Sequence, residues 1–587
     1  MKRSEPALDK YSASIPSDRQ ALLLLVYLTA SLTIPGIVLA CTEVRSAWSA
    51  AAGILLPAGV YLTAACLTRR TGIAVICMLP AVVLCSFQIV LLYLYGNSVI
   101  AADMYINLMT TNTGEASELL NNLYPAVILV CLIYLPMLFE AVRQTRRHIR
   151  ITRGMRRKVL KTGAVLCGSG LAMLAAAYAC GGAGIIEDEI FPINAIYNFY
   201  YALATKRDVQ RYPSTSDSFS YGATRCDTHG ARQIYVYIIG EASRAANWEI
   251  YGYGRHTNPQ LKARNDIAWF RNVITQSNTT HKSVPLFMSS VPIEMHHDIY
   301  RRKGVSALFR EAGFKSYFLS NQSAQGAMVD LLAKEADEVV YIGAPRHDMQ
   351  LLRMMQRIIE TDTGHDLLFI LHCYGSHFSY HQRYPREFAL FMPDNDVAIK
   401  AQNIEMIVNA YDNSILYTDH FLNSVLEYMC RLDACSAVLY CSDHGEDLLD
   451  DERGRFLHAS PTVTYYQLHV PCFAWFSEEY ARAHPDKAAA ARSHEYSAAT
   501  TRSMFHTLAD MASLEAPHIN RSVSFVSAVF DEEAPRYYLD DHNRAVSFDR
   551  RIGITDRDRE LFAEHGIDID AAQGARRAPQ RRQGAAY

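Results

Sequence analysis

The sequence predicts a membrane-spanning domain of five helices, followed by an α/β domain in which helices cover both faces of a mainly parallel sheet. Nearly all the long apolar runs of the 587-residue chain lie within residues 1–180. From residue 231 onward, strand-like and helix-like patterns alternate, which is typical of a parallel sheet with helical connections. A chain of this length is also too long for a single hydrophobic core, so we expect two or more units.

The apolar runs of the first part have the length of membrane-spanning helices. Each approaches the ~20 residues that a helix needs to cross the hydrocarbon of a bilayer. Buried core helices are a weaker explanation, because they seldom follow one another five times with charges only between them. We expect no cleaved signal peptide, since the first run is long and further spans follow it. The five predicted spans are residues 21–41, 50–68, 73–95, 124–142 and 159–179.

The distribution of Lys and Arg between the spans predicts their orientation. The loop 143–158 is densely basic, and the leader and the turn at 69–70 also carry Lys or Arg, whereas residues 97–123 contain neither. Basic loops stay on the cytoplasmic side of a membrane. An odd number of spans then places everything after residue 180 on the outer side.

Three further segments differ from both main parts in composition. Residues 97–123 mix polar and apolar side chains, which fits either an amphipathic segment at the membrane surface or a solvated connector. Residues 181–230 begin with aromatic residues suited to the interface and continue as a polar linker. The tail 571–587 has no apolar periodicity, so we expect it to be disordered. The α/β domain then spans residues 231–570.

Charge and cysteine content limit the partners and the covalent links. The net charge is -3 and no basic stripe occurs, so we expect no nucleic-acid partner. An even number of cysteines in an oxidising space permits disulfides. Cys430 and Cys435 are the favoured pair because they are close in sequence, while Cys373 and Cys441 fit buried thiols in strands. The pairing stays open among Cys226, Cys373, Cys430, Cys435, Cys441 and Cys472.

The predicted sheet of the second part is built on the run 233–239, which is rich in β-branched and aromatic residues. In open α/β sheets, ligands and metals collect at the carboxyl ends of the strands. Helical patterns cover 346–360 and 402–430. The predicted strands are residues 233–239, 315–320, 367–373, 436–442 and 472–476.

Carboxylate and imidazole groups follow three of these strands. Each has an ordinary explanation alone, such as a helix cap, a turn, a histidine within a strand or a surface residue. Together at one edge of one sheet they indicate a metal site, and mixed oxygen and nitrogen ligands suit zinc, with manganese as an alternative. The residues are Glu241 after the first strand, His372 and His377 at and after the third, Asp443 and His444 after the fourth, and His458 in the loop beyond.

A zinc ion with an open position lowers the pKa of a bound hydroxyl, so a side chain could act as nucleophile. The candidates are Ser243, Thr279 and Thr280. Ser243 is explained more simply as a first-turn or N-cap residue. Thr280 is at the predicted start of a helix, where backbone N–H groups favour an anion, and this gives it a modest lead.

These motifs, in this order, resemble the phosphoethanolamine transferases of the alkaline phosphatase/sulfatase superfamily. That family includes the lipid A modifying and mobile colistin resistance enzymes. The resemblance runs from the first span to about residue 515 and rests on Gly240-Glu241, Thr280, Gly375-Ser376-His377 and the run 442–446, SDHGE. It implies a bacterial inner-membrane protein with five spans and a periplasmic α/β/α sulfatase-like domain.

The resemblance also implies roles for single residues. Glu241, Thr280, Asp443 and His444 would hold one zinc ion, with Thr280 as the nucleophile. His377 and His458 would serve the substrate phosphate, a second zinc or the leaving group. Asn107, Glu115 and Ser323 match positions near the donor head group. The chain departs from the family where cysteines often flank the nucleophile, because Gln276 and Leu286 stand there.

The implied reaction moves phosphoethanolamine from phosphatidylethanolamine to an envelope acceptor through a threonine-linked intermediate. Lipid A and the lipopolysaccharide core are the favoured acceptors, and we expect a monomer. A phosphoglycerol transferase of the lipoteichoic acid synthase type and an inactive lipid-binding relative are the alternatives. A hydrolytic sulfatase is disfavoured, because the sequence lacks a Cys/Ser-x-Pro-x-Arg signature.

Overall fold

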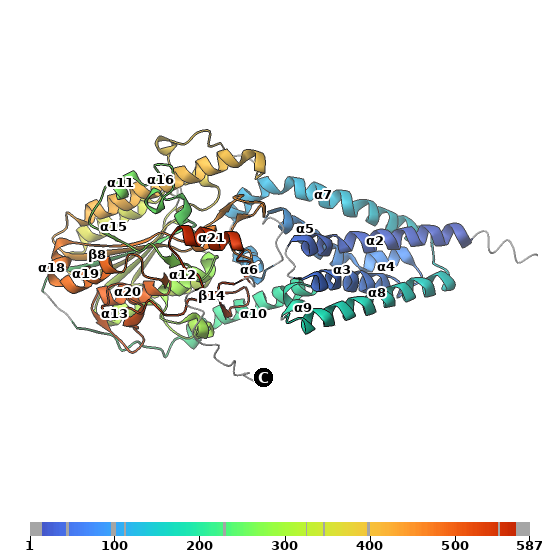
Figure 1. Cartoon of the computed structure of the whole chain (residues 1–587), viewed down its shortest axis with the longest axis horizontal. Helices are drawn as coiled ribbons and strands as arrows, with labels where there is room; N and C mark the ends of the chain where they lie inside the picture. Colours follow the sequence, from blue (N-terminus) through green and yellow to red (C-terminus); the bar gives the residue numbers. More distant parts are fainter. Residues whose placement is uncertain are drawn as a thin grey trace, which may run out of the picture. The chain divides into compact units, whose positions relative to one another are not determined.

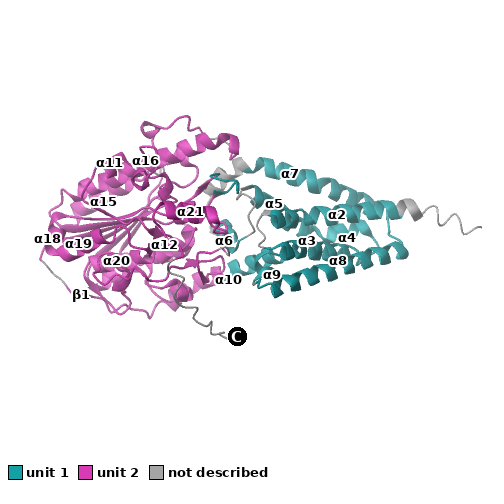
Figure 2. Cartoon of the chain, viewed as in Figure 1, with its two compact units in different colours: residues 1–108, 113–204, 449–456 teal, residues 109–112, 205–448, 457–587 magenta. Residues whose placement is uncertain are grey.

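The chain folds into two compact units, one made mostly of long helices and one built around a sheet (Figures 1 and 2). Unit 1 comprises residues 1–108, 113–204 and 449–456, and unit 2 comprises residues 109–112, 205–448 and 457–587. The computed structural model describes residues 14–42, 46–94, 101–110, 113–182, 184–226, 230–324, 326–343, 347–395, 399–549 and 552–570. The tail 571–587, for which we expect disorder, lies outside these ranges.

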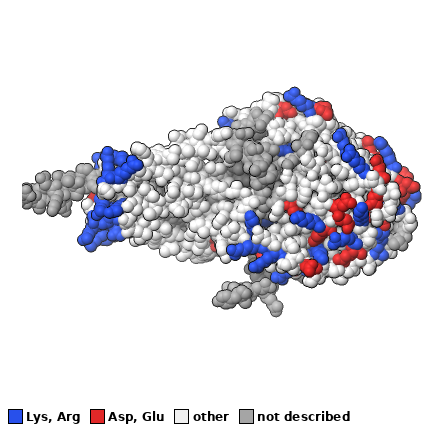
Figure 3. Space-filling model, turned by 180° about the vertical axis from the view of Figure 1, so that it is seen from behind, with Lys and Arg blue, Asp and Glu red and all other residues white. Residues whose placement is uncertain are grey.

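Unit 1 contains the predicted membrane helices. Four helices are long and apolar enough to span a bilayer, and one bent pair could form a further span, so the described residues provide four or five. Charged side chains are scarce over most of this unit and gather at one end of it (Figure 3). The helices are α2 (Ser14–Thr42), α3 (Ala47–Ala65), α4 (Thr71–Cys77), α5 (Leu79–Leu94), α6 (Ala102–Thr110), α7 (Thr113–Arg146) and α8 (Arg153–Ala179).

The third predicted span, 73–95, is not one straight helix. It is divided into α4 and α5, which meet at Met78 with a bend of 55°. Pro80, the second residue of α5, has no N–H to donate to the preceding turn, and its ring crowds that turn. The break therefore follows from a residue that is visible in the sequence.

Close packing of small residues joins α3 to α8. A Cβ atom added at Gly59 of α3 would lie 2.6 Å from the backbone nitrogen of Cys167, and one added at Gly170 of α8 would lie 2.7 Å from that of Leu56. Helices in a membrane associate through such small residues, since lipid provides little hydrophobic drive between them. Two short helical segments follow α8, namely α9 (Ile185–Asp188) and α10 (Ile193–Thr215), and α10 exposes apolar side chains such as Ile196 and Tyr200.

Unit 2 contains a seven-stranded sheet in the order β3-β11-β8-β2-β7-β5-β6. The five strands β8, β2, β7, β5 and β6 are parallel, while β11 and β3 extend the sheet in antiparallel pairing. The prediction of a mainly parallel sheet is thus confirmed. The strands are β2 (Gln233–Gly240), β3 (Ile267–Trp269), β5 (Lys315–Ser320), β6 (Glu338–Tyr341), β7 (Leu367–His372), β8 (Cys435–Ser442) and β11 (Cys472–Phe476).

Helices cover both faces of this sheet, as Figure 1 shows. The central strands β2, β7 and β8 are buried along their whole length, which explains their continuous apolar sequence. One face is covered by α12 (Thr280–Met288), α13 (Val305–Glu311) and α20 (Ser503–Met511). The other is covered by α11 (Pro259–Lys262), α15 (Met349–Thr361) and α16 (Ile404–Met429).

Smaller elements complete unit 2. The short strand pairs are β1 (Thr224–Arg225) with β13 (Leu514–Glu515), β4 (Val273–Ile274) with β12 (Ala499–Thr500), β9 (Asp447–Leu448) with β10 (Phe456–Leu457), and β14 (Tyr538–Leu539) with β15 (Ala545–Val546). The remaining α-helices are α14 (Met328–Ala333), α17 (Tyr465–Leu468), α18 (Glu478–Ala483), α19 (Pro485–Ser493) and α21 (Asp556–Glu564).

The register of the three central strands aligns their carboxyl ends. Gly240 of β2 is opposite Ser442 of β8, and Ile239 of β2 is opposite His372 of β7. The residues that follow these strands therefore leave the sheet at the same level. This register is what brings the predicted site residues within reach of one another.

The expected disulfide between Cys430 and Cys435 is wrong. Neither takes part in a disulfide, and the same holds for the other cysteines beyond residue 180. Cys430 is exposed at the end of α16, where Arg264 contacts its sulfur, whereas Cys435 opens β8 and is buried in the hydrophobic core. Closeness in sequence gave no information on where the side chains point. Cys373 and Cys441 are buried thiols, as the sequence predicts.

A buried histidine makes unit 2 sensitive to acid. His506 of α20 is 2% exposed, and burial lowers its pKa from 6.5 to about 3. Its Nδ1 accepts the N–H of Asn520 at 3.1 Å, which a protonated ring could not do. Because the unfolded chain binds this proton more readily, the stabilisation is present above pH 6.5 and is lost as pH falls towards 3.

We therefore expect the free energy of unfolding to fall by up to about 1.4 kcal/mol for each pH unit below 6.5 on account of this residue. His506→Gln should be less stable at pH 7 but should lose less stability between pH 6.5 and 4.5. Denaturant titrations of both proteins, at constant ionic strength, measure the two slopes. Equal slopes would contradict the assignment.

Candidate metal centre

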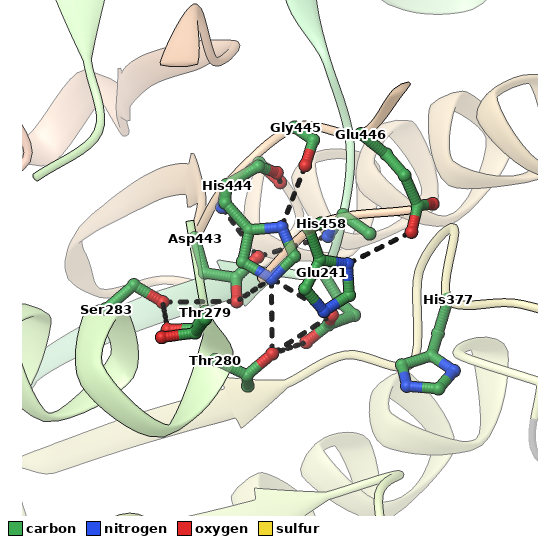
Figure 4. Close-up of polar contacts among 12 residues, drawn as sticks. Glu241, Thr279, Thr280, Ser283, His377, Asp443, His444, Gly445, Glu446 and His458 are labelled. Atoms are coloured by element: carbon green, nitrogen blue, oxygen red, sulfur yellow. Dashed lines mark hydrogen bonds and ion pairs between the residues drawn. The ribbon is translucent and has the colours of Figure 1, made fainter. Parts of the chain in front are cut away.

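Three buried residues from two neighbouring strand ends form a group suited to a metal ion. They are Glu241, directly after β2, and Asp443 and His444, directly after β8. One ligand atom from each lies within 4.8 Å of the others (Figure 4). The structure thus brings together three of the four ligands that the resemblance implies.

Backbone contacts fix the orientation of His444. Its Nδ1 lies 2.9 Å from the carbonyl oxygen of Gly445, which can only accept, so Nδ1 carries the proton. Nε2 then carries the lone pair and lies 3.3 Å from Oδ2 of Asp443 and 3.6 Å from Oε1 of Glu241. This tautomer, held by a carbonyl on the far side of the ring, is typical of metal-binding histidines.

Asp443 is held just as firmly. Its Oδ1 accepts the N–H groups of Ala242 at 3.1 Å and of His444 at 2.7 Å, and its Oδ2 accepts the hydroxyl of Ser283 at 3.3 Å. Ala242 adopts a left-handed backbone with φ of 54°, which turns the chain sharply after Glu241. Such strain in a non-glycine residue is concentrated at functional sites.

The electrostatics of the group favour a cation. Burial, together with the nearby Asp443 carboxylate, raises the pKa of Glu241 well above its usual range. Burial lowers the pKa of His444 to about 4, so its lone pair stays available at neutral pH. A divalent ion would compensate two buried carboxylates, and the set of oxygen and nitrogen donors fits zinc.

Thr280 directs its hydroxyl at this group from the first residue of α12. Its Oγ1 lies 3.2 Å from Nε2 of His444 and 3.3 Å from both carboxylate oxygens of Glu241. The hydroxyl therefore lies where a fourth ligand or a nucleophile would be needed. It also lies at a helix N-terminus, which stabilises negative charge.

The other two candidate nucleophiles are engaged elsewhere. Ser243 is 1% exposed, and its Oγ accepts the indole N–H of Trp248 at 2.8 Å. The hydroxyl of Thr279 lies 3.3 Å from that of Ser277. The geometry thus distinguishes Thr280 among three residues that sequence reasoning could not separate firmly.

The candidate histidines differ in their distance from the group. His458 packs on His444 with ring centroids 4.1 Å apart, and its Nδ1 lies 3.0 Å from Oε1 of Glu446. His377 stands to one side in Figure 4, stacked on Tyr374. Burial lowers the pKa of His458 to about 4 and that of His377 to about 3, so both rings are neutral at pH 7.

His372 belongs to the sheet and not to this group. It ends β7, and its Nδ1 lies 3.0 Å from the hydroxyl of Ser320. Ser323 lies half-buried in the loop after β5, and Asn107 is half-buried in α6. Glu115 is within α7, but its side chain lies outside the described part of the chain. The roles of Asn107, Glu115 and Ser323 therefore stay predictions.

Sequence reasoning missed two residues that contact the site. Glu446 holds His458 and accepts the hydroxyl of Tyr380 at 2.9 Å, and burial raises its pKa to about 8. Its position two residues after His444 was the available signal. Gln322 contacts Glu241 from the loop after β5 at 2.9 Å, and the signal for it was the run Ser320-Asn321-Gln322 at the end of that strand, which also resembles the family.

The second unit is similar to a known class of proteins. Residues 233–514 match the Sulfatase family. The matched range includes the seven-stranded sheet and the metal group. The second unit is therefore similar to sulfatase domains, and the predicted sulfatase-like fold is confirmed for this part.

Particular relatives within this class are phosphoethanolamine transferases, so the predicted resemblance is confirmed. The Kdo(2)-lipid A phosphoethanolamine 7''-transferase of Escherichia coli (strain K12) is 32% identical over 262 residues, covering 42% of this chain and 44% of that protein. EptA of Escherichia coli (strain K12) is 30% identical over 264 residues, covering 42% and 47%. The chain thus spans less than half the length of these two curated relatives.

Solved structures share the fold over a longer range. The integral membrane lipooligosaccharide phosphoethanolamine transferase A (EptA) from Neisseria meningitidis aligns with a TM-score of 0.68 at 21% identity, over 86% of this chain and 98% of that one. This alignment extends well beyond the sulfatase domain, so it includes part of the helical unit.

Gly375 is the residue that lets the loop after β7 approach Glu241. A Cβ atom there would lie 2.6 Å from the carbonyl oxygen of Glu241, and the φ of 43° disfavours any side chain. We expect Gly375→Ala to displace Glu241 and weaken zinc binding by roughly 10–100-fold, the range seen when groups behind a metal ligand are altered.

Competition with a zinc-binding dye measures this change on the purified protein. Gly364→Ala is the matched control, because a Cβ atom at Gly364 meets no atom within 4 Å and its zinc affinity should not change. Equal affinities for the two variants would mean that the contact between Gly375 and Glu241 has no influence on the metal group.

Proposed function

We propose that this chain is a zinc-dependent phosphoethanolamine transferase of the bacterial inner membrane, with its sulfatase-like unit in the periplasm. The observation that carries the proposal is the hydroxyl of Thr280, set within 3.3 Å of both Glu241 and His444 on a sulfatase fold. We infer from the names of the relatives that the transferred group is phosphoethanolamine. A structure of the periplasmic domain of EcEptC in complex with Zn, with a TM-score of 0.50 at 24% identity, has the same fold.

Glu241, Asp443, His444 and Thr280 would hold the zinc ion. When bound, zinc supplies a Lewis acid that lowers the pKa of a coordinated hydroxyl and stabilises charge on phosphoryl oxygens. The chain's own residues then hold the ligands and the hydroxyl of Thr280 in place. Buried carboxylates and a neutral imidazole form the site, and Thr280 is the first residue of α12, so its hydroxyl lies at the N-terminus of that helix.

The chemistry proceeds in two displacements at one phosphorus. In the first, Oγ1 of Thr280 bonds to the phosphorus of phosphatidylethanolamine, and the bond to the diacylglycerol oxygen breaks. In the second, an acceptor oxygen bonds to the phosphorus and the bond to Thr280 breaks. The phosphoethanolamine group is thereby transferred without net hydrolysis, and the threonine is regenerated.

His458 and His377 are suited to move the protons of these two steps. Both rings are neutral at pH 7, so either can take a proton from an acceptor hydroxyl. The ring of His458 packs against the ring of His444, and Nδ1 of His458 lies within hydrogen-bond distance of the Glu446 carboxyl. We assign His458 as the acid–base group nearest the nucleophile and His377 to contact with the phosphate.

The acceptor is proposed to be lipid A or the lipopolysaccharide core. One relative is named for transfer to Kdo(2)-lipid A, and another structure is named for lipooligosaccharide. Donor and acceptor are both membrane lipids in this scheme. The four or five candidate spans then keep the enzyme in the layer that contains both substrates.

Thr280→Ala should abolish transfer while leaving zinc bound with reduced affinity, because three ligands remain. The measurement is mass spectrometry of lipid A and core oligosaccharide from cells that carry each form. The wild type should add one phosphoethanolamine group, and Thr279→Ala, the neighbouring control, should retain the activity.

Labelled donors separate the proposed reaction from phosphoglycerol transfer. Label from phosphatidylethanolamine should appear on a peptide that contains Thr280, and label from phosphatidylglycerol should not. Transfer retained in Thr280→Ala, or label only from phosphatidylglycerol, would overturn the proposal.

A further inference from the structure

We propose that Gln322 is a positioning residue that fixes the Glu241 carboxylate for metal binding. It follows β5 by two residues and is 4% exposed. Its Nε2 lies 2.9 Å from Oε2 of Glu241 and 2.9 Å from the carbonyl oxygen of Cys373. The inference rests on the zinc site of the proposed function and adds a residue outside the ligand set.

The two contacts determine which way the amide faces. A carboxylate oxygen and a carbonyl oxygen are both acceptors, so the atom between them must be the nitrogen. Each of the two amide hydrogens then has one partner. Gln322 therefore links Glu241, which follows β2, to Cys373, which follows the neighbouring strand β7.

The contact distinguishes the two oxygens of Glu241. Oε2 accepts the amide of Gln322, while Oε1 is the oxygen 3.6 Å from Nε2 of His444. Rotation of the carboxylate would break the contact with Gln322. The amide thus fixes the rotation of the carboxylate and keeps Oε1 on the side of His444.

The backbone of Gln322 is itself held in place. Its N–H donates to the hydroxyl of Ser320 at 3.1 Å, and the same hydroxyl lies 3.0 Å from Nδ1 of His372. All three residues are buried. His372, which sequence reasoning offered as a site residue, therefore contacts the metal group only indirectly. It supports, through Ser320, the loop that carries Gln322.

An amide suits this position better than a charged group. A lysine or arginine next to Glu241 would compete electrostatically with a divalent ion for the carboxylate. A second carboxylate would add to the two that are already buried, at a high desolvation cost. A neutral donor satisfies Oε2 without opposing the metal.

The test compares zinc affinity with metal-free stability in the full-length, detergent-solubilised protein. Gln322→Leu and Gln322→Met both remove the two donors and keep a side chain of similar size. We expect either variant to bind zinc roughly 10–100-fold more weakly than the wild type in competition with a chelating dye. Two variants guard against one that fails to fold.

The matched control is Gln233→Leu, which removes another buried glutamine at the opposite end of β2, where its Oε1 accepts the hydroxyl of Tyr235. Its zinc affinity should equal that of the wild type, even if its unfolding temperature without metal falls as far as that of the Gln322 variants. Unchanged zinc affinity in folded Gln322→Leu or Gln322→Met overturns the inference. Failure of the wild type to bind zinc at all would instead overturn the proposed function.

Discussion

The candidate metal centre of the sulfatase-like unit depends on two carboxylates buried side by side. Glu241 and Asp443 are at most 1% exposed, and each would carry a charge that the interior penalises by several kcal/mol. They are brought together by the register of β2 and β8, so the sheet itself creates the electrostatic conflict. A divalent cation would resolve it, and the surrounding residues orient oxygen and nitrogen lone pairs towards one point.

That arrangement is made largely from backbone groups and neutral side chains. The N–H of Ala242 holds Asp443, the carbonyl of Gly445 holds His444, and the amide of Gln322 holds Glu241. None of these partners adds charge beside the ligands. The loops after the strands therefore supply the groups that orient the proposed ligands.

The sequence revealed most of the sheet and the centre of the site, for a physical reason. Strands buried on both faces have continuous apolar runs, and parallel strands end at one edge, so Glu241, Asp443 and His444 could be grouped before any contact was known. The short edge strands β3 and β6 lacked such a signal. The role of Gln322 could not be predicted, because it depends on which strands are neighbours. The Cys430–Cys435 pairing failed because side-chain direction, not sequence distance, decides whether two thiols meet.

The segment that carries Thr280, the proposed nucleophile, is held in place without the disulfide that the resemblance led us to look for. Gln276 and Leu286 stand at those positions. The N–H of Gln276 donates to the hydroxyl of Thr501 at 3.1 Å, its carbonyl accepts the N–H of Leu539 at 2.8 Å, and Leu286 is buried in the core. One residue earlier, Thr275 donates its hydroxyl to the carbonyl of Asp443 at 2.6 Å. The segment with the proposed nucleophile is thus tied to Asp443, a proposed metal ligand, by hydrogen bonds and packing and not by a link between thiols.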